Sequence, residues 1–134
     1  LIIYSEEADR VHYAFAMASA AAAIDIKTTL FLTMGAIKAL LGKPDEVSDG
    51  WNNLRTNLGV SGYELNKKFR DTNVATFEEL IEACSSLGVE IMVCEMGLRV
   101  LGVQREDLRA DITISEGGLV SFYAKAGNGP ITFI

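Results

Sequence analysis

Short apolar runs and helix-favouring segments alternate along the whole chain, and this alternation most constrains its fold. The apolar runs are continuous rather than alternating in polarity, which is typical of strands buried on both faces. Such strands form parallel sheets that are covered by helices on both sides. The predicted strands cover residues 1–5, 27–33, 90–93, 111–115 and 130–134. We therefore expect a three-layer α/β/α sandwich with a mainly parallel sheet of about five strands.

Helix signals separate these strands. An alanine-rich segment favours a first helix, and Thr76 followed by Glu79 forms a capping-box pattern at the start of another. Gly88 is a typical glycine at a helix C-terminus. The predicted helices cover residues 8–24, 36–41, 63–71, 77–87, 95–101 and 117–126. Residues 1–134 are expected to form one domain, and 44–73 an excursion from it that serves as a lid or a partner surface.

Composition excludes several classes of function. The formal net charge is −6 and no Lys/Arg-rich run interrupts it, so neither nucleic acid nor an anionic membrane surface is an expected partner. The longest apolar run, residues 14–24, is too short to span a bilayer, which takes about 20 residues. The chain starts at Leu1 inside an apolar run and without Met, so we expect that a few N-terminal residues are missing.

Cysteine usage and surface polarity indicate a compartment and an assembly. Two cysteines make no disulfide framework, and no secretory signal precedes them, which favours the reducing cytoplasm. The chain is 49% hydrophobic, and the alanine-rich residues 18–23 have no polar face. We therefore expect part of the apolar surface to be buried against another subunit in a homo-oligomer.

Cys94 is the candidate for chemistry. It follows the predicted strand 90–93 and precedes the predicted helix 95–101. The backbone N–H groups of Glu95, Met96 and Gly97 would point at its sulfur, and this setting favours a nucleophilic thiolate. The alternative is an inert buried thiol, because cysteine is among the most buried residue types.

Other candidates gather at the same sheet edge, since ligands of open parallel sheets bind outside the carboxyl ends of the strands. His12, the only histidine, is either a solvated or interface histidine or a proton shuttle or thiolate partner for Cys94. With one histidine no metal site is expected, and without a glycine-rich phosphate loop no cofactor is expected. Cys84 is expected to fill core at helical spacing. The candidate edge residues are Ser5, His12, Thr33, Met34, Gly35, Gly117 and Gly118.

A block of residues around Cys94 carries a family resemblance: 91–96 (Ile-Met-Val-Cys-Glu-Met), Leu98, 101–103 and 105–108. In order and spacing, this block resembles the DsrE/DsrF-like sulfur-relay proteins. The alanine-rich first helix leading into residues 27–33 is similar too, as is Gly117-Gly118 ahead of the last helix. The resemblance implies a flavodoxin-like, DsrEFH-like fold and homo-oligomers. It also implies that Cys94 carries sulfane sulfur as a persulfide or thiosulfonate and passes it to a small carrier protein of the TusA type.

Three hypotheses follow. The first is a cytoplasmic sulfurtransferase or sulfur carrier that acts through Cys94. The second is a non-catalytic oligomeric binding or scaffold module of the same fold, with an inert Cys94. The third is a thiol redox sensor that forms a reversible Cys84–Cys94 disulfide.

Overall fold

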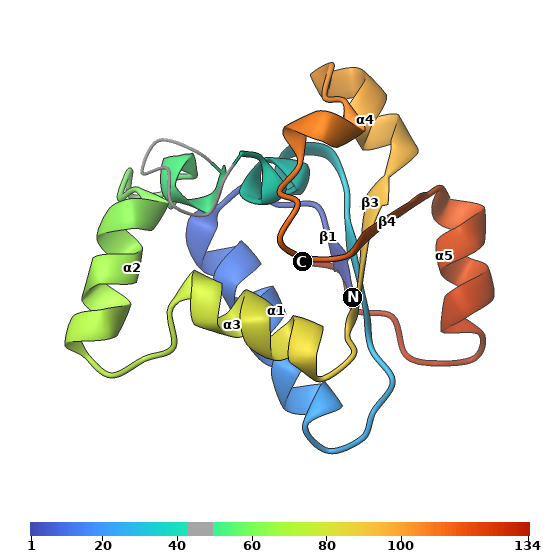
Figure 1. The fold of residues 1–134 in the computed structure, drawn as a ribbon, viewed down its shortest axis with the longest axis horizontal. Coiled ribbons are helices and arrows are strands. Elements are labelled where there is room, and N and C mark those ends of the chain that lie inside the picture. The colour runs from blue at the N-terminus through green and yellow to red at the C-terminus, as the bar shows by residue number, and fades with distance from the viewer. Residues whose placement is uncertain (43–49) are drawn as a thin grey trace.

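A parallel sheet lies at the centre of the computed structural model, which describes residues 1–42 and 50–134 (Figure 1). Its four strands lie side by side in chain order, and each neighbouring pair is parallel. The predicted α/β class and parallel sheet are confirmed. The strands are β1 (Ile2–Ile3), β2 (Thr29–Leu32), β3 (Glu90–Cys94) and β4 (Ile114–Gly117).

The C-terminal residues extend the sheet beyond β1. The Ile2 amide donates to the Thr132 carbonyl at 2.7 Å, and the Ile134 amide donates to the Ile2 carbonyl at 2.8 Å. Ile2 and Phe133 form a parallel bridge. The fifth strand predicted over residues 130–134 is therefore present only as this paired segment.

Helices cover the sheet on both faces. In the described part of the chain, α1 and α3 pack on one face and α5 covers the other (Figure 1). Strand side chains alternate between the two faces: Leu30 and Leu32 join the main core, whereas Phe31 stacks on Phe122 of α5 with ring centroids 5.0 Å apart. The helices are α1 (Ala8–Ala22), α2 (Gly62–Asp71), α3 (Phe77–Ser86), α4 (Glu95–Leu101) and α5 (Leu119–Ala126), with 3-10 turns η1 (Met34–Leu40), η2 (Gly50–Asn53) and η3 (Arg105–Asp107).

Chain direction explains why α5 lies alone. From β1 to β4 the chain moves one way along the sheet, so right-handed crossovers keep the connections on a single face. After β4 it returns to the outer side of β1, where Ile134 pairs with Ile2. Because the direction is reversed, a right-handed crossover places α5 on the opposite face.

Two elements differ from their predicted form. The segment predicted as a helix over residues 36–41 is the 3-10 turn η1, whose buried residues recur every three positions (Ala36 with Ala39, Ile37 with Leu40), the period of a 3-10 helix. The strand predicted over residues 111–115 is β4, shifted toward the C-terminus.

Arg109 accounts for the shift of β4. Its guanidinium Nη2 lies 2.6 Å from Asp111 Oδ2 and 2.7 Å from Glu78 Oε2 of α3. Because Asp111 is held by this buried arginine rather than by the sheet, strand pairing starts at Ile114. Gly117, predicted as the first residue of the last helix, consequently ends β4 beside Cys94.

Helix α2 belongs to the predicted excursion over residues 44–73, of which 44–49 lie outside the described residues. It starts with a capping box between Ser61 and Glu64, and the predicted capping box of Thr76 and Glu79 is also formed at the start of α3. Helix α2 packs on the outer side of α1 (Figure 1).

His12 joins α1 to the segment around α2. Its Nε2 lies 2.7 Å from the carbonyl oxygen of Ala75, and its ring stacks on Phe69 with centroids 4.0 Å apart. Because a carbonyl only accepts hydrogen bonds, Nε2 carries a proton and donates it. Burial lowers the pKa of His12, and the hydrogen bond to Ala75 opposes this effect only in part.

This histidine makes stability depend on pH. Its pKa is lowered from 6.5 in the fold, so the unfolded chain takes up the proton first as pH falls. The free energy of unfolding therefore keeps its full value above the unfolded-state pKa of 6.5 and decreases below it. For one group the decrease is at most about 1.4 kcal/mol per pH unit. In His12→Gln, urea unfolding between about pH 7.5 and 5.5 should lose most of this slope.

Glu79→Gln is the matched control. The pKa of the Glu79 carboxyl is lowered from 4.5, so this group titrates below the window and its loss should leave the wild-type slope unchanged. Equal slopes for wild type and His12→Gln would contradict the assignment.

Candidate functional site

Four residues lie in register at the carboxyl edge of the sheet. Cys94 of β3 pairs with Gly117 of β4. Leu32 pairs with both Ile3 and Val93, so the next residues, Tyr4, Thr33 and Cys94, continue the row. The Thr33 amide donates to the Ile3 carbonyl at 2.9 Å, which extends this pairing past β2. Alternation along each strand directs Tyr4, Thr33 and Cys94 to the face that α5 covers.

Cys94 stands between strand and helix, as the sequence predicts. It ends β3 and is the N-cap residue of α4, with extended backbone angles (φ −80°, ψ 120°). Its side chain makes no capping hydrogen bond to the amides of the first helical turn. The residue is 2% exposed, so its sulfur is nearly enclosed in this state.

The residues around this sulfur form a small cluster under α5, separate from the main core. Among the described helices, α5 alone covers this face, whereas α1 and α3 cover the other (Figure 1). A small cluster with a single covering helix opens at a lower free energy than a large core does. The cluster consists of Ile2, Phe31, Met92, Cys94 and Phe122.

The first turn of α4 fits tightly against the end of β2. A Cβ atom added at Gly97 would lie 2.7 Å from the Met34 backbone nitrogen and 2.6 Å from Ile37 Cδ1. Met34 itself has a positive φ of 49°, a conformation that is strained in residues other than glycine. This contact fixes α4, and with it the amides of Glu95 to Gly97, relative to Thr33.

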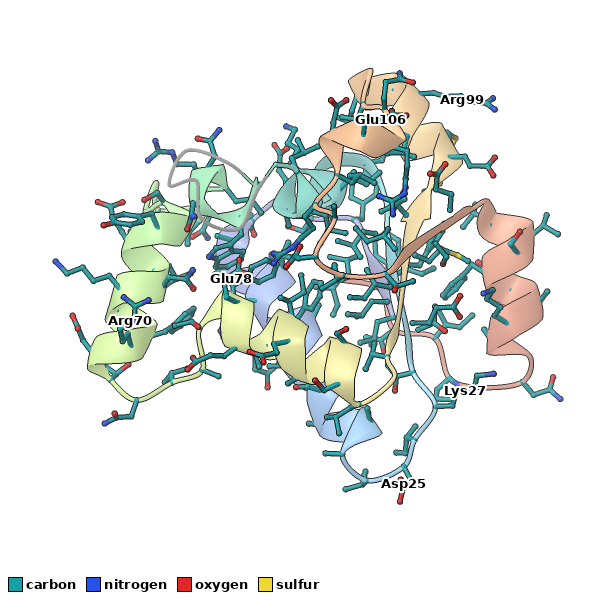
Figure 2. The ribbon with its side chains drawn as sticks, in the orientation of Figure 1. Asp25, Lys27, Arg70, Glu78, Arg99 and Glu106 are labelled. Carbon is teal, nitrogen blue, oxygen red and sulfur yellow. The ribbon has the colours of Figure 1, made fainter. Side chains whose placement is uncertain are left out.

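The charged side chains of α4 lie outside the cluster. Glu95 is exposed, and Arg99 extends away from the protein (Figure 2). Met96, also in the first turn, is 52% exposed. The cluster partners of the thiol are therefore apolar, Thr33 adjoins it in the row at the sheet edge, and Met96 faces solvent.

A hollow of about 700 Å³ opens beside this row, at the ends of β1 and β2. Its carboxylates are paired: Glu6 lies 2.6 Å from Lys38 and Glu7 lies 2.6 Å from Arg10. The hollow contains three predicted edge residues, Ser5, Met34 and Gly35. Its lining is Tyr4, Ser5, Glu6, Glu7, Arg10, Met34, Gly35, Phe133 and Ile134.

Two residues from the sequence hypotheses lie elsewhere. His12 contacts Ala75 and Phe69 on the α1 side of the sheet, and Cys94 lies on the α5 side, so the structure does not bring them together. Cys84 is enclosed in the main core, as predicted. Burial raises the pKa of the Cys84 thiol to about 11, and its sulfur donates to the Phe15 carbonyl at 3.4 Å.

The two thiols thus lie on opposite sides of the sheet, which gives a Cys84–Cys94 disulfide no support.

Gly118 is the N-cap of α5, and an added Cβ there would meet nothing within 4 Å, so packing does not require glycine at this position. Gly117 has less space around it, because a Cβ atom added there would lie 3.2 Å from Ser121 Cβ.

Sequence reasoning missed Tyr4 and Phe122. The alternation of Ile2, Ile3 and Tyr4 could have placed Tyr4 on the face of Cys94, but a strand read as uniformly apolar hides that alternation. For Phe122 no local signal exists, because its contact with Phe31 depends on the return of the chain across the sheet.

Within the described parts of the chain, no group of three or more His, Cys, Asp or Glu residues could hold a metal ion. The same residues include no helix with the length and apolar character needed to cross a membrane.

Comparison with known proteins identifies the family. The chain is 26% identical over 149 aligned residues to YrkE, an uncharacterized protein of Bacillus subtilis (strain 168), and the alignment covers 98% of this chain and 92% of that protein. The model of the DsrE/DsrF/DrsH-like family matches residues 52–134, which include Cys94, β4 and α5. The chain therefore belongs to the DsrE/DsrF/DrsH-like family, whose membership points to sulfur relay in the broad sense.

Proposed function

We propose that this protein is a sulfurtransferase or sulfur carrier in which Cys94 holds the transferred sulfur. The observation that carries the proposal is the position of Cys94: among the two cysteines, it alone ends a strand at the carboxyl edge of the sheet. Family membership supports sulfur relay, and ligands of open parallel sheets bind at this edge. The enclosed Cys84 is unsuited to the role.

The chemistry is thiol exchange without net oxidation. The Cys94 thiolate attacks the outer sulfur of a persulfide donor; the new S–S bond forms as the old one breaks, and the donor leaves as a thiolate. With thiosulfate the leaving group is sulfite. An acceptor thiolate then attacks the outer sulfur on Cys94 and leaves with it, which restores the Cys94 thiolate. With tetrathionate, attack on an inner sulfur gives a thiosulfonate on Cys94 and releases thiosulfate.

Backbone amides of Glu95, Met96 and Gly97 are proposed to stabilise the charge on the transferred sulfur. The Cys94 side chain makes no hydrogen bond to these amides in the structure. The outer sulfur of a persulfide extends one bond farther from the backbone than the thiol sulfur does. The contact of Gly97 with Met34 holds these amides in place.

Transfer requires that the enclosed sulfur become accessible. The face that α5 covers is the weaker side of the fold, because a single helix and a small cluster close it. We propose that local displacement at this face, rather than unfolding of the main core, admits donor and acceptor.

The expected acceptor is a small sulfur-carrier protein of the TusA type, in the cytoplasm, and a homo-oligomer is the expected assembly. Exposed apolar side chains on α4 and α5 support contact with other protein surfaces next to Cys94. The net charge of −6 disfavours nucleic acid as a partner. The exposed apolar residues are Met96, Val100, Leu119, Val120 and Tyr123.

One observation favours the second hypothesis, a binding or scaffold module with an inert Cys94: the residue is only 2% exposed. The two hypotheses differ in a measurable way, since an inert cysteine acquires no sulfur from any donor.

Measurement of the intact protein mass distinguishes the two hypotheses. After incubation with thiosulfate, tetrathionate or polysulfide, wild type and Cys84→Ser should gain sulfur-containing mass, and Cys94→Ser should gain none. The gain should disappear on treatment with a thiol reductant, because sulfane sulfur is labile to thiols. An adduct that persists in Cys94→Ser, or no adduct with any of the three donors, would contradict the proposal.

Loosening the α5 face should speed the reactions of Cys94. In Phe122→Ala the ring that stacks on Phe31 is lost, so alkylation of Cys94 by iodoacetamide should accelerate about tenfold or more through easier local opening. Phe122→Leu should give a smaller acceleration. The measurement is the alkylation rate of each cysteine by peptide mass spectrometry in native buffer.

Cys84 is the internal control for this experiment. It lies in the main core, so local opening leaves its slow alkylation unchanged, whereas global unfolding accelerates both cysteines together. Parallel acceleration of the two thiols, or an unchanged Cys94, would refute opening at α5 as the route of access.

A further inference from the structure

Thr33 is the polar neighbour of Cys94 on the same sheet face. It continues β2 with extended backbone angles (φ −134°, ψ 159°), and the pairing of Leu32 with Val93 puts it opposite Cys94. Side chains that are in register on neighbouring strands have Cβ atoms about 5 Å apart. A threonine hydroxyl at this position reaches a cysteine sulfur by rotation about its own side-chain bond.

Thr33 is a largely buried residue, and its hydroxyl has no hydrogen-bond partner among the described residues. The residue is 8% exposed, and within residues 1–42 and 50–134 its hydroxyl makes no hydrogen bond. Among the described side chains, only the indole nitrogen of Trp51 is both fully enclosed and unpartnered; the Thr33 oxygen is therefore reachable by water or a ligand.

The other hydroxyls near this position belong to more exposed residues. Gly117, on the opposite flank of Cys94, has no side chain, and the hydroxyl that lies against it, 3.5 Å from the position of an added Cβ, is that of exposed Ser121 on α5. Tyr4, on the far flank of Thr33, is 53% exposed and stacks on Phe133 with ring centroids 5.8 Å apart. Thr33 is thus the one hydroxyl in the row that directly adjoins Cys94.

We propose that Thr33 is a positioning residue whose hydroxyl donates a hydrogen bond to Cys94 Sγ when that sulfur is charged. This inference rests on the proposed function. A donor to the thiolate favours the charged form before attack. When an acceptor takes the outer sulfur, the electron pair of the broken S–S bond returns to Cys94 Sγ, and the same hydrogen bond stabilises it. Thr33 keeps its proton throughout.

Two matched variants test the role. Thr33→Val keeps the shape and removes the hydroxyl, whereas Thr33→Ser keeps the hydroxyl and removes a methyl group. The first readout is the alkylation rate of Cys94 by iodoacetamide as a function of pH, which rises as thiolate forms. In Thr33→Val the profile should move to higher pH, with a rate at neutral pH about three- to tenfold lower and an unchanged plateau at high pH.

Thr33→Ser should follow the wild-type profile. If Thr33 contributed only to packing, Thr33→Ser would be more impaired than Thr33→Val, because Ser leaves a void and Val fills it. A Thr33→Val profile that superimposes on that of wild type, or a Ser variant that is more impaired than Val, overturns the inference.

The second readout is sulfur transfer from thiosulfate-loaded protein to a small thiol acceptor. Thr33→Val should release sulfur more slowly than wild type and Thr33→Ser should not. Alkylation requires no sulfur donor, so failure of the proposed function can be distinguished from failure of the role of Thr33. A wild type that takes up no sulfur refutes the proposed function, whereas a wild type that transfers sulfur as fast as Thr33→Val refutes only the role of Thr33.

Discussion

Parallel backbone pairing from β1 to β4 is the constraint on which the rest of the structure depends. It sets the register in which Tyr4, Thr33, Cys94 and Gly117 reach the same edge. A shift of one residue in β3 would turn Cys94 toward the main core and bring Val93 to the α5 face. The neighbours of the sulfur at this edge are thus determined by main-chain pairing along the strands.

The two faces of the sheet differ in the size of the core they contain. The α1 and α3 face contains the large core, where Cys84 is enclosed and its thiol pKa is raised to about 11. The α5 face contains a small cluster closed by Phe122. The two cysteines, ten positions apart, therefore differ in environment because α1 and α3 cover one face of the sheet and α5 covers the other. The position of α5 follows in turn from the reversed direction of the last crossover.

Much of this arrangement could be predicted from local sequence. Continuous apolar runs indicated a parallel sheet, Thr76 and Glu79 indicated the start of α3, and the strand–Cys–helix order at Cys94 was visible directly. What could not be predicted depends on contacts distant in sequence. Arg109 shifts β4 by pairing with Glu78 and Asp111, and His12 binds Ala75 on the far side of the sheet from the thiol.

The enclosure of Cys94 is compatible with a role in carrying sulfur. A persulfide exposed to solvent reacts with any thiol in a reducing compartment, because exchange depends on access as well as on thiolate character. A sulfur that is covered by one helix and reached only after local opening is protected between partners. In the proposed function, the face that α5 covers limits exchange to encounters that displace α5, and the face that α1 and α3 cover keeps the register that places Thr33 beside the sulfur. Burial and reactivity are in this way properties of two different states of the same edge.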